Sequence, residues 1–557
     1  MGVRMKCAIT PAQVREQILS AVSANGGHLA SSLGAVELAF ALTEVFDPAV
    51  DRVVWDVGHQ AYAWKILTGR AEKFHALRLH GGVAPFLSPS ESDADAFISG
   101  HAGVAIAAAA GLAAGEARLA HGKVPQVVAV VGDAALMNGE SLEALHNLVR
   151  LGHKIIVVLN YNGHDCTDSG CAFTADFFKV FGLPYVGPVD GHDVEALVKA
   201  LASARECETS IVVHAVTQKG KGFPPAEADP AAWHCVGPFE LAGAAEVKSK
   251  GECDSILHTK PSPSAASTWS DWFGEAMVAA ARRDDRVCAV VAAMKEGTGL
   301  SVFAEEFPGR FFDVGICEEM AVTFAAGLAK AGMRPVVAIY STFLQRAIDQ
   351  IQHDVCLQHL PVVFAIDRAG CVGADGATHH GLYDISLLRS LTGIRIFAPI
   401  CAEDMAAVLD DALFADGPSA IRYPKGEAVR RNGLPTVNSQ RENGVRILAV
   451  GDQVQKAIKV KRLLANSDIA ADVVPVDRVK PIAFGESTAK LTVAMENGVV
   501  SGGFGESVGA DLKFGWPDAA IGHGTVDELE REFGFDAESV ALKIAAHLRK
   551  MEERYDG

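Results

Sequence analysis

The sequence lacks most of the features that are typical of secreted proteins, of proteins with structural zinc sites and of nucleic-acid-binding proteins. Its 11 cysteines are scattered and no two of them form a CxxC pair, so neither a zinc site nor a disulfide framework is indicated. Basic residues are in deficit, with 50 Lys and Arg against 68 Asp and Glu and a net charge of −18. A surface with this charge repels nucleic acid and anionic lipid over most of its area.

Long apolar runs and repeats are also lacking. The first 11 residues contain no apolar core of a signal peptide. The most membrane-like stretch, 102–115, consists mainly of Ala and Gly, and Glu116 and Arg118 close it before it could cross a bilayer. It is typical of a tightly packed internal helix. We therefore expect a protein of a reducing cytoplasm, with no membrane partner and no nucleic-acid partner.

The sequence does contain a series of short β-branched runs that end in Gly, Asp, Asn or Ser. Such runs suit strands buried on both faces, as in a parallel sheet. Helical patterns such as 141–151 and 193–204 lie between them. This alternation predicts doubly wound α/β domains whose ligands gather at the carboxyl ends of the strands. The runs are Val127–Asp133, Ile155–Asn160, Ile211–Thr217, Val336–Ser341, Val362–Asp367, Ile447–Gly451 and Val473–Asp477.

Two polar stretches divide the chain. The first, 237–270, has the composition of a linker, and the second, 430–443, is rich in turn residues. The 557 residues correspond to about three domains. We expect domains at 1–240, 265–430 and 440–557, with a linker at 241–264.

Asp133 and Asn162 each follow an apolar run, and 29 positions separate them. A carboxylate and an amide oxygen at neighbouring strand ends, with a nearby backbone carbonyl, suit a hard divalent cation such as magnesium with diphosphate oxygens. Gly132 lets the chain turn closely, and helix N-termini can hold phosphate. These residues alone fit equally well a turn with an Asx cap.

Longer strings carry a resemblance to a known family. With these strings included, the sequence is identified as a member of the 1-deoxy-D-xylulose-5-phosphate synthases, which are similar to transketolases. The strings cover the first two domains in family order, and the third domain matches loosely at 496–498 and 502–503. They are 26–32 (GGHLASS), 55–62 (WDVGHQAY), 65–70 (KILTGR), 187–193 (GPVDGHD), 340–346 (YSTFLQR), 366–370 (IDRAG), 373–376 (GADG) and 421–424 (IRYP).

The resemblance implies three doubly wound domains of the thiamine diphosphate-binding, transketolase-like fold, with the diphosphate end in the first and the pyrimidine end in the second. It implies thiamine diphosphate and magnesium as cofactors. The implied reaction joins pyruvate to D-glyceraldehyde 3-phosphate with loss of carbon dioxide, for isoprenoid, thiamine and pyridoxal precursors. It also implies a homodimer whose active site lies between the first two domains of one subunit.

The resemblance further implies roles for individual residues. Glu318 would hold the cofactor's pyrimidine in its imino form, although an exposed carboxylate at a helix start would look the same. Imidazoles and a carboxylate would serve proton transfer, each with a structural alternative: His28, His59, His234, His379 and Asp375. The cofactor-binding set is His59, Gly100, His101, Ala102, Asp133, Ala134, Ala135, Asn162, Phe223 and Glu318.

Magnesium would take Asp133, Asn162 and the backbone carbonyl of His164. Arg368 and Arg422 resemble a phosphate clamp for the acceptor, with Tyr340 donating a hydrogen bond, because a guanidinium fork fits phosphate oxygens. The alternative for the two arginines is a structural ion pair at a domain boundary. His28, Asp375 and His379 would also line the substrate site.

The chain departs from the family pattern at several of these positions. Ala134 replaces a Gly, 102–105 has lost hydroxyls, Phe223 replaces a Tyr, and Met320 replaces a His. Asn162 and Gly187 are only 25 positions apart, where the family has several tens of extra residues that cover the site. Two other functions therefore stay open: a related carboligase or ketol transferase with another donor or acceptor, and a cofactor-poor binding or regulatory paralogue.

Overall fold

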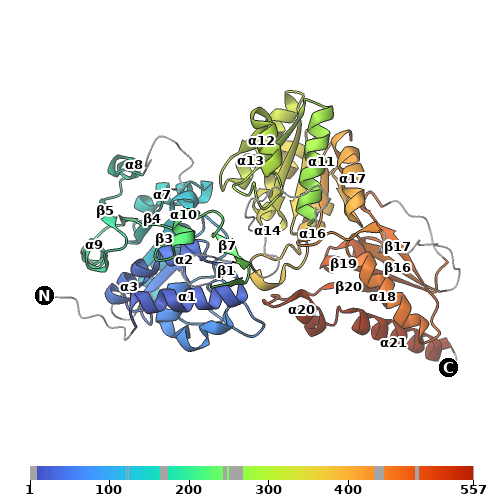
Figure 1. Ribbon diagram of the computed structural model, residues 1–557, viewed down its shortest axis with the longest axis horizontal. Helices are drawn as coiled ribbons and strands as arrows, with labels where there is room; N and C mark the ends of the chain where they lie inside the picture. The colour runs from blue at the N-terminus through green and yellow to red at the C-terminus, as the bar shows by residue number, and fades with distance from the viewer. Residues whose placement is uncertain are drawn as a thin grey trace. The chain divides into compact units, whose positions relative to one another are not determined.

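The computed structural model describes residues 9–120, 122, 124–163, 173–241, 248–249, 268–431, 444–482 and 488–555. The chain forms two compact units, Met1–Thr259 and Lys260–Gly557 (Figure 1). The second unit holds two separate sheets, and the three domains predicted from the sequence stay a prediction. Within the described residues, no helix is long and apolar enough to cross a membrane.

The first unit is built on a five-stranded parallel sheet in the order β2-β3-β4-β6-β5. The apolar runs predicted from 127 and from 155 become its central strands, and every residue of Val127–Val131 and Ile156–Asn160 is buried, which confirms strands covered on both faces. The strands are β2 (Arg52–Trp55), β3 (Val127–Gly132), β4 (Ile156–Tyr161), β5 (Tyr185–Asp190) and β6 (Ile211–Val216).

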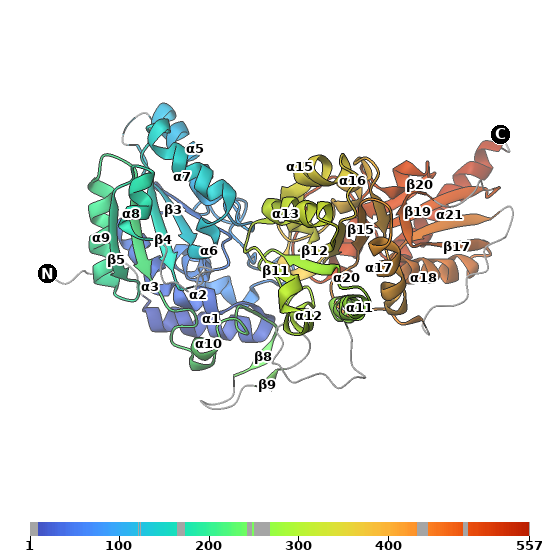
Figure 2. The ribbon, with the colours of Figure 1, turned by 90° about the horizontal axis from the view of Figure 1, so that it is seen from above.

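Helices pack in pairs around this sheet, α3 with α9 and α5 with α7 (Figure 2). The Ala-rich stretch predicted to be an internal helix forms α5, whose buried residues face β2 and β3. The main helices are α1 (Pro11–Asn25), α2 (Ala30–Gly34), α3 (Val36–Val45), α4 (Tyr62–Lys65), α5 (Ala105–Leu119), α6 (Asp133–Leu136), α7 (Gly139–Leu151), α8 (Ala175–Val180), α9 (Val194–Glu206) and α10 (Pro224–Ala228).

The second unit contains a seven-stranded sheet in the order β11-β10-β12-β13-β15-β14-β18, parallel except for the β14–β18 pair. Its strands are β10 (Val287–Val291), β11 (Phe311–Asp313), β12 (Arg334–Tyr340), β13 (Val363–Asp367), β14 (Arg395–Phe397), β15 (Ser419–Arg422) and β18 (Arg478–Lys480). Its principal helices are α11 (Trp269–Arg283), α12 (Ser301–Glu306), α13 (Glu318–Lys330), α14 (Ser341–Leu344), α16 (Asp384–Arg389) and α17 (Met405–Leu413).

The last part of the chain adds a four-stranded parallel sheet in the order β17-β16-β19-β20. Helices α18 and α21 pack against each other beside it (Figure 1). One apolar core spans both sheets of the unit, because Val337 and Phe364 share it with Leu448 and Ala494. The elements are β16 (Val445–Val450), β17 (Ala471–Val476), β19 (Leu491–Val499), β20 (Leu512–Trp516), α18 (Gln453–Ala465), α19 (Phe504–Ser507), α20 (Val526–Phe533) and α21 (Ala537–Tyr555).

Candidate functional site

Asp133 and Asn162 lie together at the carboxyl edge of the first sheet. Asp133 follows β3 and begins α6, and its Oδ1 accepts a hydrogen bond from the N–H of Ala134 at 2.9 Å. Its Oδ2 accepts one from the N–H of Asn162 at 3.0 Å. The buried Oδ1 of Asn162 has no hydrogen-bond donor among the described residues. This edge therefore presents oxygen atoms suited to a hard cation. His164, the third predicted metal ligand, lies outside the described residues.

The loop that carries Gly100, His101 and Ala102 is tied to the end of β2. Asp56 accepts hydrogen bonds from the N–H groups of Gly103 and Ala105, both at 2.9 Å. A Cβ at Gly103, where φ is +91°, would lie 2.3 Å from Oδ1 of Asn138, so only glycine fits there. Asp56 thus fixes the loop whose backbone precedes α5, a role that the sequence analysis did not assign. The sequence did contain a sign of this role, because the WDVGHQ string places Asp56 directly after an apolar strand.

Three of the predicted histidines form a cluster, His28, His59 and His234. Their ring centroids are 6.0 Å apart for His28–His59, 5.6 Å for His28–His234 and 5.3 Å for His59–His234. A short antiparallel pair, β1 (Gly27–His28) with β7 (Cys235–Val236), brings residues 28 and 234 together although they are far apart in sequence. Phe86 packs 5.4 Å from the His28 ring.

The loop 217–223 borders the Asp133 edge and carries Phe223. Lys219 lies on it, and burial lowers the pKa of its ammonium group to about 8, against the opposing effect of Asp133. Among the described residues, no carboxylate forms an ion pair with it. Sequence reasoning missed Lys219; the available signal was its place in the short loop after β6, beside Gly220. Phe223 packs edge-on against Trp233, with ring centroids 5.1 Å apart.

In the second unit, Glu318 is the first residue of α13 and is buried. Burial raises the pKa of its carboxyl group, and the Arg346 guanidinium, 3.5 Å from Oε2, opposes that rise. This contact lies at the outer limit of hydrogen-bond distance, and Oε2 accepts no shorter hydrogen bond from the described residues. A buried carboxyl with a raised pKa can hold a proton or share it with a ligand nitrogen.

Tyr340, Arg368 and His379 belong to one cluster near the ends of β12 and β13, in which Phe343 lies between Tyr340 and the edge-on ring of His379. The Arg368 guanidinium lies 4.1 Å from the Tyr340 ring centroid, and Phe343 stacks on Tyr340 at 5.8 Å. The His379 ring is 5.6 Å from Phe343. Asp367, fully buried, pairs with Arg368 at 2.9 Å. Arg368 thus presents a fixed, aromatic-backed cation.

Asp375, also predicted for this site, accepts a hydrogen bond from Lys425 at 3.4 Å. It closes a short helical turn, 373–375, four residues before His379. The structure therefore brings Asp375 and His379 onto one loop, as their spacing in the sequence suggests.

Arg422 is buried in an ion pair. Its Nε donates to Oδ2 of Asp384 at 2.7 Å, and its Nη2 donates to the carbonyl oxygen of Asn497 at 2.8 Å. Asn497 belongs to β19 and Arg422 to β15, so the guanidinium joins the two sheets of the unit. This ion pair is the structural alternative that the sequence left open for Arg422, and its phosphate-binding role stays a prediction.

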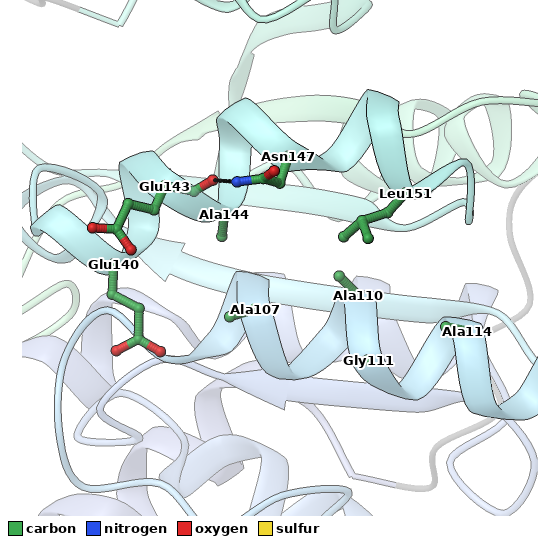
Figure 3. Close-up of a pocket in the computed structure, with 9 residues that line it drawn as sticks. All are labelled: Ala107, Ala110, Gly111, Ala114, Glu140, Glu143, Ala144, Asn147 and Leu151. Carbon is green, nitrogen blue, oxygen red and sulfur yellow. Dashed lines mark hydrogen bonds between the residues drawn. The ribbon is translucent and has the colours of Figure 1, made fainter.

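A pocket between α5 and α7 is separate from all these residues (Figure 3). Small side chains of α5 line one side, and Glu140, Glu143 and Leu151 of α7 lie on the other. It contains none of the predicted site residues.

Comparison with known proteins identifies the family. The sequence model described as 1-deoxy-D-xylulose-5-phosphate synthase matches residues 6–170 and 167–217. Those of the transketolase pyrimidine binding domain and C-terminal domain match 265–430 and 436–540. The relative named 1-deoxy-D-xylulose-5-phosphate synthase 1 from Geobacter metallireducens is 38% identical over 97% of this chain and 96% of its own length. The chain belongs to the 1-deoxy-D-xylulose-5-phosphate synthase family.

Other members of the synthase family show the same degree of similarity. The protein of the same name from Geobacter sulfurreducens is 40% identical over 96% of this chain and 94% of its own length. That alignment spans 615 positions against the 557 residues of this chain, so at least 58 positions of the relative have no counterpart here. The fold is that of the transketolase-type domains, α/β with parallel sheets.

Proposed function

We propose that the protein is a 1-deoxy-D-xylulose-5-phosphate synthase, which condenses pyruvate with D-glyceraldehyde 3-phosphate and releases carbon dioxide. The observation that carries this proposal is family membership together with a buried oxygen that accepts no hydrogen bond from the described residues, Oδ1 of Asn162. The buried carboxyl of Glu318, whose Oε2 lies 3.5 Å from Arg346, adds to it. Buried polar atoms without partners cost free energy, and such atoms in a folded protein point to a ligand that satisfies them.

These residues fit thiamine diphosphate with Mg²⁺. Asp133 and Asn162 would supply oxygen ligands to the metal, and the Lys219 ammonium group would offset the charge of the diphosphate. N–H groups of the 100–105 loop, held by Asp56, would donate to its oxygens. When bound, thiamine diphosphate supplies a carbon nucleophile and an electron sink for the loss of carbon dioxide.

Glu318 would act on the cofactor's pyrimidine ring. Burial raises the pKa of this carboxyl, so it exchanges a proton with a ring nitrogen more readily than an exposed glutamate would. Arg346, 3.5 Å from Oε2, opposes this rise. Removing the carboxyl should therefore abolish the reaction while leaving the metal ligands intact.

The remaining residues would serve the substrates. The cluster of His28, His59 and His234 would move protons at the oxygen atoms of pyruvate and of the aldehyde during bond formation. Arg368, backed by Tyr340, would bind the acceptor phosphate, and His379 with Asp375 would hold the acceptor's hydroxyl groups by hydrogen bonds. The resemblance also supports a homodimer, which light scattering after size-exclusion chromatography tests.

The test uses purified protein with pyruvate, glyceraldehyde 3-phosphate, thiamine diphosphate and Mg²⁺. We expect equal amounts of carbon dioxide and deoxyxylulose 5-phosphate, and loss of both in Glu318→Gln. Glu319→Gln, which changes the adjacent, half-buried carboxylate, is the matched control and should stay active. Absence of both products from the wild-type protein would refute the proposal.

A donor panel in the same assay separates the open alternatives. Product formed from a ketose phosphate without carbon dioxide would identify a ketol transferase instead. Failure of the wild-type protein to bind thiamine diphosphate in calorimetry with Mg²⁺ would identify a cofactor-poor paralogue.

A further inference from the structure

The string 187–193 contains a histidine that the proposed reaction does not use. His192 lies in the turn after β5, and a close approach of backbone holds this turn against the end of β6. The N–H of Gly191 donates to the carbonyl oxygen of Val216 at 2.8 Å. A Cβ at Gly191 would lie 2.4 Å from a Thr217 methyl group, so glycine is required there. The side chain of His192 consequently reaches the loop 217–223.

His192 forms one hydrogen bond on each ring nitrogen. Its Nε2 accepts the N–H of Gln218 at 2.8 Å, and its Nδ1 lies 3.1 Å from Oε2 of Glu37. A nitrogen that accepts a hydrogen bond carries no proton, so the proton of the neutral ring must be on Nδ1. Nδ1 then donates to the carboxylate, and the two contacts define a single tautomer.

Glu37 is itself anchored from a third element. Arg15 of α1 donates to both of its oxygens, at 2.7 and 2.6 Å, and its Nε donates to the carbonyl oxygen of Lys221 at 2.8 Å. Burial acts to raise the pKa of Glu37, but the hydrogen bonds from His192 and Arg15 outweigh it and lower the pKa to about 2. The ionised Glu37 carboxylate therefore binds the side chains of His192 and Arg15, and each of these forms a hydrogen bond to the backbone of loop 217–223.

The gripped loop is the one that borders the Asp133 edge. Thr217 donates from its N–H to the carbonyl oxygen of Tyr161 at 2.8 Å, directly before Asn162. Lys219 lies between Gln218 and Lys221, the two residues whose backbone groups form these hydrogen bonds, and Phe223 follows them. The position of the cationic side chain thus depends on bonds made on both sides of it.

We propose that His192 is a positioning residue for cofactor binding: with Glu37 and Arg15 it fixes loop 217–223, and thereby Lys219, for a diphosphate ligand. This inference rests on the proposed function, since it takes the diphosphate to be that of thiamine diphosphate. His192 does not touch the ligand. It orders the loop before the ligand binds, so that less conformational entropy is lost on binding.

The test compares two substitutions at the same position. His192→Gln keeps one acceptor and one donor, whereas His192→Leu fills similar space and keeps neither. The dissociation constant of thiamine diphosphate, measured by calorimetry with Mg²⁺, should rise about 10- to 100-fold in His192→Leu, as expected for loss of hydrogen bonds that involve a charged group. It should rise less than threefold in His192→Gln and in His146→Ala, an exposed histidine of α7.

Limited trypsin digestion gives a second readout that needs no cofactor. Cleavage after Lys219 and Lys221 should be faster in His192→Leu than in His192→Gln or the wild type. Unchanged affinity together with unchanged cleavage in a folded His192→Leu protein would overturn the inference.

The inference can still be tested if His192→Leu does not fold or if the wild-type protein does not bind thiamine diphosphate. If His192→Leu does not fold, Gln218→Pro removes the donated N–H instead, and unchanged affinity in that variant would overturn the inference equally. If the wild-type protein does not bind thiamine diphosphate, the proposed function has failed. Faster cleavage in His192→Leu would then still support the inference that His192 orders loop 217–223.

Discussion

The ion pair between Arg422 and Asp384 should hold the second unit together rather than bind substrate. Arg422 is 3% exposed and Asp384 is 4% exposed, so neither charge has water to replace a lost partner. In Asp384→Ala the guanidinium would keep one hydrogen-bond acceptor among the described residues, the Asn497 carbonyl oxygen, and the weaker attraction of Asp452 and Glu496. Breaking a buried pair from one side costs about 3–5 kcal/mol.

That cost converts to a measurable shift in thermal unfolding. For a unit as large as Lys260–Gly557, ~1 kcal/mol moves the midpoint by about 1.6 °C at roughly 2.1 cal/mol/K per residue, so Asp384→Ala should unfold about 5–8 °C below the wild type. The double variant Asp384→Leu with Arg422→Met removes both charges and should recover most of the loss, because apolar replacements of buried pairs are often neutral. Circular dichroism or calorimetry measures both midpoints.

Kinetics of the double variant then separate a structural role from a phosphate-binding one. We expect its KM for glyceraldehyde 3-phosphate to stay within about threefold of the wild type, whereas Arg368→Lys, which loses the planar fork stacked on Tyr340, should raise KM about tenfold. A double variant that is stable but has a KM raised a hundredfold would refute the reasoning, as would an unchanged midpoint in Asp384→Ala.

Three other predictions follow from the buried charges. Glu318→Gln should lower kcat at least a thousandfold with normal Mg²⁺-dependent cofactor binding, and equal losses in Glu319→Gln would contradict this. Burial raises the pKa of Glu496 from 4.5 to about 7; because the folded protein then binds this proton more tightly than the unfolded chain, stability should fall by about 3 kcal/mol as pH rises through that window, and Glu496→Gln should abolish the slope in urea titrations. Lys219→Met should weaken thiamine diphosphate binding about tenfold below pH 8, with the difference vanishing at higher pH as the wild-type lysine loses its charge; a difference that persists at pH 10 would exclude a charge effect.

Local pattern was enough to predict the central strands. The runs that begin at 127, 155, 336 and 362 are apolar without alternation, and each became a strand with neighbours on both sides. Strand ends then placed Asp133 beside Asn162, because parallel strands end at one edge of a sheet. The histidine cluster could not be predicted from local pattern, because it depends on the pairing of β1 with β7, which lie near opposite ends of the first unit's sequence.

The partners of the charged residues could not be predicted. Nothing near Arg422 in the sequence indicates that Asp384, 38 positions earlier, neutralises it, because the contact arises from how α16 packs against β14 and β19. The same holds for Glu37 and His192, which lie 155 positions apart. Such pairs depend on tertiary packing, and single-sequence patterns report only on local structure and burial.

The most direct measurement of the proposed activity follows both carbon fragments of the donor at once. With uniformly ¹³C-labelled pyruvate, unlabelled glyceraldehyde 3-phosphate, thiamine diphosphate and Mg²⁺, nuclear magnetic resonance should show one labelled carbon dioxide for each deoxyxylulose 5-phosphate labelled at its first two carbons. Labelled carbon dioxide without the labelled sugar phosphate, or neither product, would contradict the assignment of this protein as a synthase.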